Sequence, residues 1–180
     1  MNGVLIMKRF FVFILLAFIV LATSSTVFAL PHGENNPAIF KDMKSNPSNY
    51  ILTGAVGMGL IYYMDKSSIK VDKYAPPEYI IAFRLVTHKT PENYTCDADD
   101  RLTRYRYDYK SRRMYREIIS RENGESRWEY IDPSVASNPN VKSATLKLIA
   151  EGELAFYLAY NMSFYDKPVT YVLKEYIAKN

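Results

Sequence analysis

Ser67 and Lys70 are the first residues of this chain whose types and spacing could do chemistry. They lie in the stretch YYMDKSSIKVDK (62–73) and fit the pattern S-x-x-K, in which a lysine amine takes the proton of a serine hydroxyl during acyl transfer. That chemistry needs a helix, because residues three apart share one face of a helix but lie on opposite faces of a strand.

The residues on both sides of this pair favour strands. LIYYM precedes the pair and IKV lies around its lysine, and both segments are rich in β-branched or aromatic residues. The S-D-N partner motif is absent, and the nearest approach to K-T-G is K-T-P. Asp65 is typical of a residue whose side chain accepts backbone N–H bonds in a turn. We therefore interpret 65–68 as a turn between two strands, and not Ser67 as a nucleophile.

The sequence contains few residue patterns that could support other catalytic chemistry or bind a metal ion. His32 and His88 are the only histidines and Cys96 is the only cysteine, so the zinc-binding clusters of His and Cys cannot form. GAVGMG (54–59) reverses the dinucleotide fingerprint and has no strand-to-helix unit around it. DADDRL (97–102) begins like a calcium loop but lacks its glycine. We expect no cofactor, no metal and no enzymatic activity.

The single cysteine also excludes an intramolecular disulfide. Cys96 is followed by Asp97, Asp99 and Asp100, whose charges disfavour the thiolate. Two interpretations remain open for this thiol: a bystander, or one half of a disulfide between two chains.

The N-terminal residues 1–29 predict a secretory signal peptide. Basic residues precede an apolar run of 13 residues (10–22), and the small residues of TSSTVFA follow it, with Ala29 at the cleavage position. The start is Met1 or Met7. The alternative is an uncleaved membrane anchor, although a membrane-spanning helix needs about 20 apolar residues.

Cleavage after Ala29 leaves a mature chain of 151 residues, enough for one domain with one core. Removing Lys8 and Arg9 leaves 21 basic residues against 19 acidic ones, a net charge of +2. This balance alone does not indicate a polyanionic partner. The expected location is the cell envelope, the periplasm or the outside of the cell.

Residues 30–56 are predicted to be an irregular lead-in with one short helix. Asn36 suits the cap of that helix, Pro37 suits its first position, and Pro47 lies ten residues later. An α+β domain is expected over 57–165.

Six segments of this domain are rich in Ile, Val, Tyr, Phe and Thr and are separated by turn residues, which predicts an antiparallel β-meander of about five or six strands. The segments are 59–65, 69–74, 78–89, 102–110, 112–120 and 126–132. The third is almost continuously apolar, so it is expected to be a central strand buried on both faces.

A helix is predicted over 151–165. Leu154, Leu158 and Met162 follow one another at helical spacing, and the segment lacks charge after Glu153. Glu151 and Glu153 are expected at the helix start, where the dipole favours negative charge. The segment before the helix is ambiguous between strand and helix. We expect this helix to cover the sheet and residues 166–180 to form a C-terminal tail with a short terminal helix.

The segments YYMDKSSIKVDK, YIIAFRLVTHK, TRYRYDYKSRRMY and RWEYIDPS together resemble the surface-adhesin protein E type domains, short exported bacterial proteins with a Y-Y-x-D-x-S-S-I hairpin near the start. EGELAFYLAYNMSFY is similar to the C-terminal helix of small uncharacterised exported bacterial envelope proteins with the same hairpin. The resemblance covers roughly 59–165. It implies an antiparallel sheet with a packed helix, export, and contact with host or envelope surfaces. No catalytic or adhesive residues come with it.

Basic and aromatic residues alternate between 101 and 121. Eight basic residues stand there against Asp108 and Glu117, with four tyrosines between them. In the segment LTRYRYDYK, Tyr105 and Tyr107 point to one face of the strand and the arginines to the other. We expect the tyrosines to face the helix. The arginines then form either a solvated outer face or a binding face.

The candidate interaction face is the outer side of this predicted hairpin. Its basic residues are Arg104, Arg106, Lys110, Arg112, Arg113 and Arg116. Interleaved arginine and aromatic residues also suit stacking on single-stranded nucleic acid. The Gly-Phe core of RNA-recognition motifs is absent, however, and export argues against such a partner. We expect anionic envelope polymers or a surface protein, and no nucleic acid.

These observations favour an exported, non-enzymatic binding or interaction module at the bacterial cell envelope or surface, similar to an adhesin. One alternative is a small secreted hydrolase with a cleft on the sheet, using Ser67 or a pair of carboxylates. A second is a structural envelope protein anchored in the membrane by an uncleaved N-terminus. The oligomeric state stays open.

Overall fold

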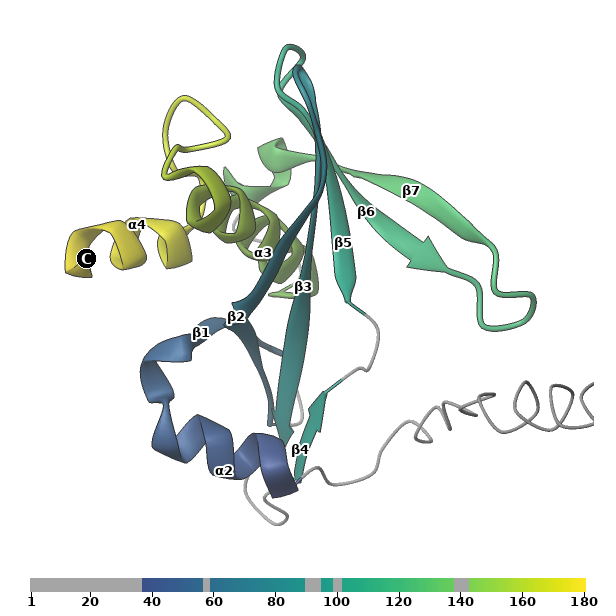
Figure 1. Ribbon diagram of the computed structural model, residues 1–180. Helices are drawn as coiled ribbons and strands as arrows, with labels where there is room; N and C mark the ends of the chain where they lie inside the picture. The colour runs from purple at the N-terminus through teal and green to yellow at the C-terminus, as the bar shows by residue number, and fades with distance from the viewer. Residues whose placement is uncertain (1–36, 57–58, 90–94, 99–101, 138–142) are drawn as a thin grey trace, which may run out of the picture. The chain divides into compact units, whose positions relative to one another are not determined.

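Seven strands form one antiparallel sheet (Figure 1). The computed structural model describes residues 37–56, 59–89, 95–98, 102–137 and 143–180, so the predicted signal peptide and the Asn36 cap lie outside the described residues. The sheet order is β1-β2-β3-β5-β6-β7, and β4 pairs with β3 next to β5. The strands are β1 (Tyr50–Val56), β2 (Leu60–Ala75), β3 (Glu78–Lys89), β4 (Thr95–Ala98), β5 (Thr103–Asp108), β6 (Arg113–Ile119) and β7 (Ser126–Ile131).

Helices precede and follow the sheet in the chain. They are α2 (Pro37–Ser45), α3 (Ser143–Tyr160) and α4 (Tyr171–Lys179), with the short 3₁₀ helices η1 (Pro47–Asn49) and η2 (Pro133–Ser137). The predicted α+β class, an antiparallel meander covered by a C-terminal helix, is confirmed. The short helix that begins at Pro37 and the short terminal helix are confirmed as well.

Two strands lie where the sequence predicts irregular chain. β1 occupies the end of the lead-in and pairs with β2, with a register shift between Leu52 and Gly54. β4 lies in the predicted loop after β3 and pairs with the half of β3 that β5 leaves free. Tyr50, Ile51, Thr53 and Val56 give β1 clear strand propensity, so the prediction of irregular chain there overlooked a local signal. β4 has little such propensity, and its conformation depends on backbone pairing with β3.

The predicted turn at 65–68 is wrong. β2 runs through it as one strand of 16 residues, and its pairing with β3 shifts register between Asp65 and Lys70. The extra residues form a bulge rather than a reversal of the chain. Asp65 does accept the backbone N–H of Ser67, at 3.0 Å, as predicted.

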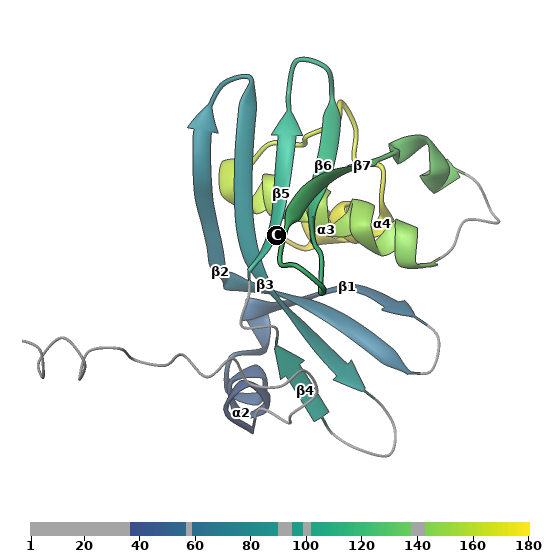
Figure 2. The ribbon, with the colours of Figure 1, turned by 90° about the vertical axis from the view of Figure 1, so that its right-hand side faces the viewer.

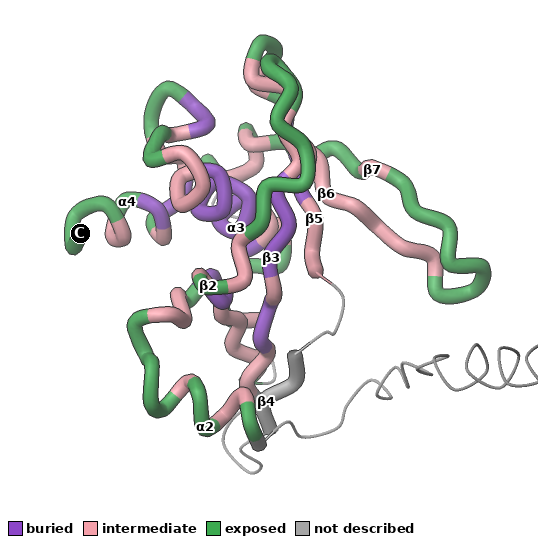
Figure 3. Tube along the Cα trace, in the orientation of Figure 1, coloured by how far each residue is buried: buried purple, intermediate pink, exposed green. Residues whose placement is uncertain are grey.

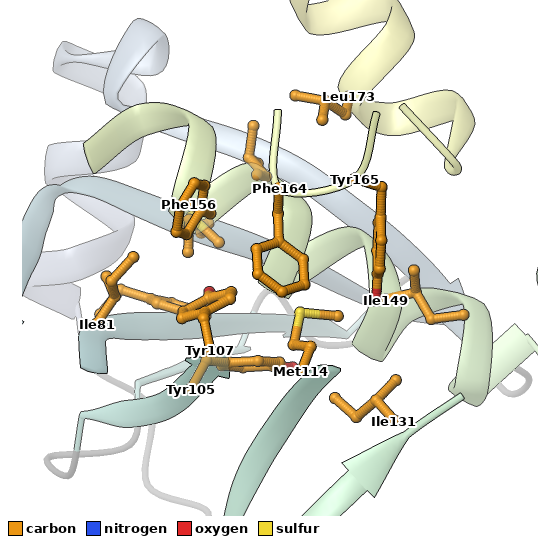
Figure 4. Close-up of a cluster of buried hydrophobic side chains, with 14 of the residues drawn as sticks. Ile81, Tyr105, Tyr107, Met114, Ile131, Ile149, Phe156, Phe164, Tyr165 and Leu173 are labelled. Carbon is orange, nitrogen blue, oxygen red and sulfur yellow. The ribbon is translucent and has the colours of Figure 1, made fainter. Parts of the chain in front are cut away.

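The core lies between α3 and one face of the sheet, which we call the inner face. Tyr105, Tyr107 and Met114 of β5 and β6 are fully buried there. Figure 4 shows these side chains meeting Ile149 and Phe156 of α3, with Phe164, Tyr165 and Leu173 closing the cluster from the C-terminal segment. The alternation predicted for β5 is therefore confirmed.

The covering helix differs from the prediction at both ends. α3 begins at Ser143, so the ambiguous segment before it is helical, and it ends at Tyr160. Met162 lies beyond the helix and is 45% exposed, whereas it was predicted on the apolar stripe. Glu151 and Glu153 lie in the middle of the helix and are fully buried, so the prediction that they begin it is wrong.

We call the opposite face of the sheet the outer face, and α3 does not cover it (Figure 2). α2 packs near β4, and Phe40 of α2 lies 6.4 Å from the ring of His88. Figure 2 looks onto the outer face of β5, β6 and β7, with α3 behind the strands. Among the described residues, no helix is long and apolar enough to cross a membrane.

Candidate interaction face

The structure divides the six predicted face residues between two sides of the sheet. Residues paired directly across neighbouring strands share a face. Arg106 pairs with Tyr115 and Arg113 pairs with Asp108, all on the outer face, whereas Arg116 pairs with the buried Tyr105 on the inner face. Arg104 lies on the outer face with Arg106.

Arg104 is held by carboxylates from two other strands. Its Nε lies 3.0 Å from Oδ2 of Asp72 on β2, and its Nη1 lies 3.3 Å from Oε1 of Glu117 on β6. Ala82 of β3 stands opposite Arg104, and its small side chain allows the guanidinium to cross that strand. The side chain of Glu117 is only 9% exposed. Arg104 therefore links three strands, and its charge is compensated within the fold.

Arg106 instead lies among aromatic rings. Its guanidinium carbon is 4.4 Å from the ring centroid of Tyr115 and 5.4 Å from that of Trp128 on β7. Tyr130, 48% exposed, extends the cluster, since its ring centroid is 5.6 Å from that of Tyr115. The side chain of Arg106 makes no hydrogen bond or ion pair with the residues that the structure describes. We call Arg106, Tyr115, Trp128 and Tyr130 the aromatic–arginine cluster.

Two of the six residues belong to the inner side, so the expectation that all six share the outer face is wrong. Arg112, in the β5–β6 turn, donates to the carbonyl of Phe164, pairs with Asp166 at 3.3 Å, and lies 3.8 Å from the ring centroid of Tyr109. These contacts tie the turn to the segment after α3. Lys110, in the same turn, is exposed.

Arg116 lines a pocket of about 280 Å³ between β6, β7, η2 and α3. Its Nε is buried and has no hydrogen-bond partner among the described residues. The pocket contains charges of both signs, because Glu129 and Asp132 also line it. Hydrogen bonds from Ser134 lower the pKa of Asp132. The remaining lining residues are Ile118, Tyr130, Ile131, Val135, Thr145 and Leu148.

A buried polar cluster that the sequence reasoning missed links α3 to the sheet. Lys147 Nζ lies 2.7 Å from Oε1 of Glu151, and the Tyr105 hydroxyl donates to Oε2 of Glu151 at 2.9 Å. Lys147 also lies 4.0 Å from the ring centroid of Tyr62. Burial first, and then the charge of Glu151, raise the pKa of Tyr105, so its hydroxyl stays protonated and donates. The i, i+4 spacing of Lys147 and Glu151 was the available sequence signal.

The residues of the S-x-x-K pattern are bound to different carboxylates. The Ser67 hydroxyl donates to Oδ1 of Asp65 at 2.6 Å, and Lys70 Nζ lies 3.1 Å from Oδ1 of Asp72. Ser68 accepts the backbone N–H of Arg84 from β3, at 2.7 Å. These contacts supply hydrogen bonds at the β2 bulge, where the ladder is interrupted.

The search for a metal site and the comparisons with known proteins both gave negative results. Within the described ranges, no three His, Cys, Asp or Glu side chains gather as metal ligands do. Comparison with protein-family models, with curated proteins and with solved structures found no match to this chain. The resemblance to surface-adhesin domains therefore rests on the sequence motifs alone.

Proposed function

We propose that this protein is an exported, non-enzymatic binding module of the bacterial cell envelope or surface, and that it binds through the aromatic–arginine cluster on the outer face. One observation carries the proposal. The inner face is packed under α3, whereas the outer face of β5, β6 and β7 carries arginine, tyrosine and the single tryptophan of the chain in mutual contact. These three residue types dominate the energetics of protein interfaces.

The charges of this face favour a protein partner over an anionic polymer. Arg104 is paired with Asp72 and Glu117, and Lys73 lies 2.5 Å from Glu78. Because these cations are already compensated, little net positive potential remains to attract a polyanion. Arg106 keeps its donors free while its planar group is held against the rings, as in many protein interfaces.

Export and envelope location are part of the same proposal. They rest on the charged start, apolar centre and small-residue exit of residues 1–29, and on the resemblance to exported domains.

Arg106→Ala tests the binding face. We expect retention of the protein on envelope fragments of the producing cell to fall about tenfold, because a central arginine of an interface contributes roughly 1–2 kcal/mol. Retention is measured by co-sedimentation at low and at high salt. Arg106 suits this test better than Arg104, whose replacement removes ion pairs that join three strands.

Lys110→Ala is the matched control, because Lys110 is exposed in the neighbouring turn and lies outside the cluster. A protein partner predicts a loss for Arg106→Ala alone, with weak salt dependence. Equal losses for both variants, and release of the wild type by salt, would instead indicate an anionic polymer. Unchanged retention of a folded Arg106→Ala protein would show that this face does not bind.

A further inference from the structure

β7 is an edge of the sheet. In the sheet order it is the last strand and pairs only with β6. It lies at the outer margin of the sheet in Figure 1 and is exposed along most of its length in Figure 3. An edge strand presents a row of backbone N–H and C=O groups that can pair with another strand.

The side chains of β7 alternate between the two faces. Trp128 pairs with Glu117 on the outer face, and Arg127 pairs with Ile118 on the inner face. Glu129 shares the inner face with Arg127, opposite Arg116. Both Arg127 and Glu129 are exposed, and neither makes an ion pair with any residue that the structure describes. Two opposite charges without an ion pair therefore flank Trp128 at the free edge.

This charge pattern is complementary to itself. When two β7 strands are placed antiparallel about a twofold axis at Trp128, Arg127 stands opposite Glu129 of the partner subunit, and Glu129 stands opposite the partner's Arg127. Ser126 then stands opposite the partner's Tyr130 on the other face. Opposite charges at directly opposed positions stabilise an antiparallel pair.

Other registers are disfavoured by the same charges. The twofold axis and the alternation of side chains require shifts in steps of two residues. A shift in one direction places Arg127 opposite the partner's Arg127, and a shift in the other places Glu129 opposite the partner's Glu129. Like charges directly opposed destabilise the pair. Among the registers that keep most of β7 paired with β7, the charges therefore favour the one centred on Trp128.

We propose that β7 pairs with β7 of a second copy of this chain in that register, so that two sheets join into one. The contact is isologous, because each copy contributes the same strand and the same two charges. It places the two Trp128 side chains next to each other and brings both aromatic–arginine clusters onto one continuous outer face. The inference does not depend on the proposed binding function, since Arg127 and Glu129 lie on the inner face.

Charge reversal in the full chain tests this pairing. Arg127→Glu places two pairs of glutamates opposite each other in a homodimer, and Glu129→Arg places two pairs of arginines there. We expect each variant alone to dimerise at least about tenfold more weakly than the wild type. A 1:1 mixture of the two variants is expected to recover dimers, because every opposed pair in the heterodimer is then attractive.

Sedimentation velocity over a concentration series measures the association, with reductant present so that Cys96 cannot bridge two chains. Arg121→Glu is the matched control, since Arg121 is exposed in the β6–β7 turn and is expected to leave dimerisation unchanged. Circular dichroism verifies that each variant is folded. Arg127→Glu is the cleaner single variant, because it faces Ile118 in its own chain, whereas Glu129 faces Arg116.

Three results would overturn the proposal. The first is a wild type that stays monomeric through the concentration series. The second is dimerisation of folded Arg127→Glu protein as strong as that of the wild type. The third is a mixture of the two variants that associates no better than either alone.

Discussion

At the scale of single residues, Gly152 sets how closely α3 approaches the sheet. A Cβ at this position would collide with Sδ of Met114, and it would lie 2.8 Å from Cε of Met114 and 2.9 Å from Cδ1 of Tyr105. The carbonyl of Gly152 also accepts a hydrogen bond from the Tyr107 hydroxyl, at 2.9 Å. Glycine is therefore required for close packing here, although it lowers helix propensity.

Gly152→Ala tests this packing. Helix propensity alone predicts that alanine stabilises α3 by about 1 kcal/mol, whereas overpacking of a buried contact costs roughly 1–3 kcal/mol. Because the neighbouring atoms belong to a close-packed core, we expect net destabilisation, measured by urea unfolding. In a Met114→Ala background the same change should cost much less. A stabilised Gly152→Ala protein would contradict the close approach.

At the scale of elements, buried carboxylates hold the C-terminal helices in place. Oε1 of Glu153 accepts the backbone N–H of Val169 at 2.7 Å. Its Oε2 accepts the N–H and the hydroxyl of Thr170, at 2.8 and 2.7 Å. Thr170 is the residue before α4, so a side chain of α3 fixes the start of α4. A sequence pattern shows neither of these partners, since they lie more than a dozen residues away.

Glu153→Gln tests this link through its pH dependence. Burial raises the pKa of Glu153 above its usual value, and the hydrogen bonds only partly offset that rise. Because its pKa is raised in the folded state, the folded protein binds the Glu153 proton more tightly than the unfolded chain does. The stability that this proton contributes is fully present below the unfolded pKa of about 4.3. It is lost as the pH rises through the folded pKa. Glutamine does not titrate.

We expect Glu153→Gln to be less stable by roughly 1–3 kcal/mol at low pH, because one acceptor oxygen is replaced by an amide. The difference from the wild type should narrow as the pH rises above about 4, as measured by urea unfolding. Glu175→Gln is the control, since Glu175 is a carboxylate of α4 whose pKa is lowered by Lys179. A difference that widens with pH would show that the folded state prefers the ionised Glu153.

At the scale of the whole molecule, the two faces of the sheet differ in what they carry. The inner face carries the core and the buried Lys147–Glu151 pair, and the outer face of β5 to β7 carries the aromatic–arginine cluster. Arginine residues of one hairpin have different roles: Arg112 anchors the turn to the segment after α3, whereas Arg106 lies among aromatic rings on the outer face. Edge pairing through β7 would double the exposed cluster without altering the core.

The proposed export is tested by the intact mass of the protein from separated soluble and membrane fractions, measured without reductant. We expect a soluble species that begins at Leu30, because residues 1–29 have the pattern of a cleaved signal peptide. A full-length species confined to the membrane would contradict cleavage and favour an anchored structural protein. The same measurement reports whether Cys96 joins two chains.

The sequence by itself determined the class of the fold and most of its strands. Period-two alternation placed Tyr105 and Tyr107 in the core, and a continuous apolar run identified β3 as a central strand, because these signals are local. The short helix at Pro37 followed from local cap and proline signals in the same way.

Only the tertiary structure decided the rest. Whether Asp65 lies in a turn or a bulge depends on pairing with β3, and β4 becomes a strand because β3 offers an unpaired half to it. The burial of Glu151 and Glu153 depends on partners supplied by other elements. The division of the arginines between two faces likewise follows from cross-strand register. Each of these features depends on contacts between segments distant in sequence. Such contacts produce no local pattern in the sequence from which they could be predicted.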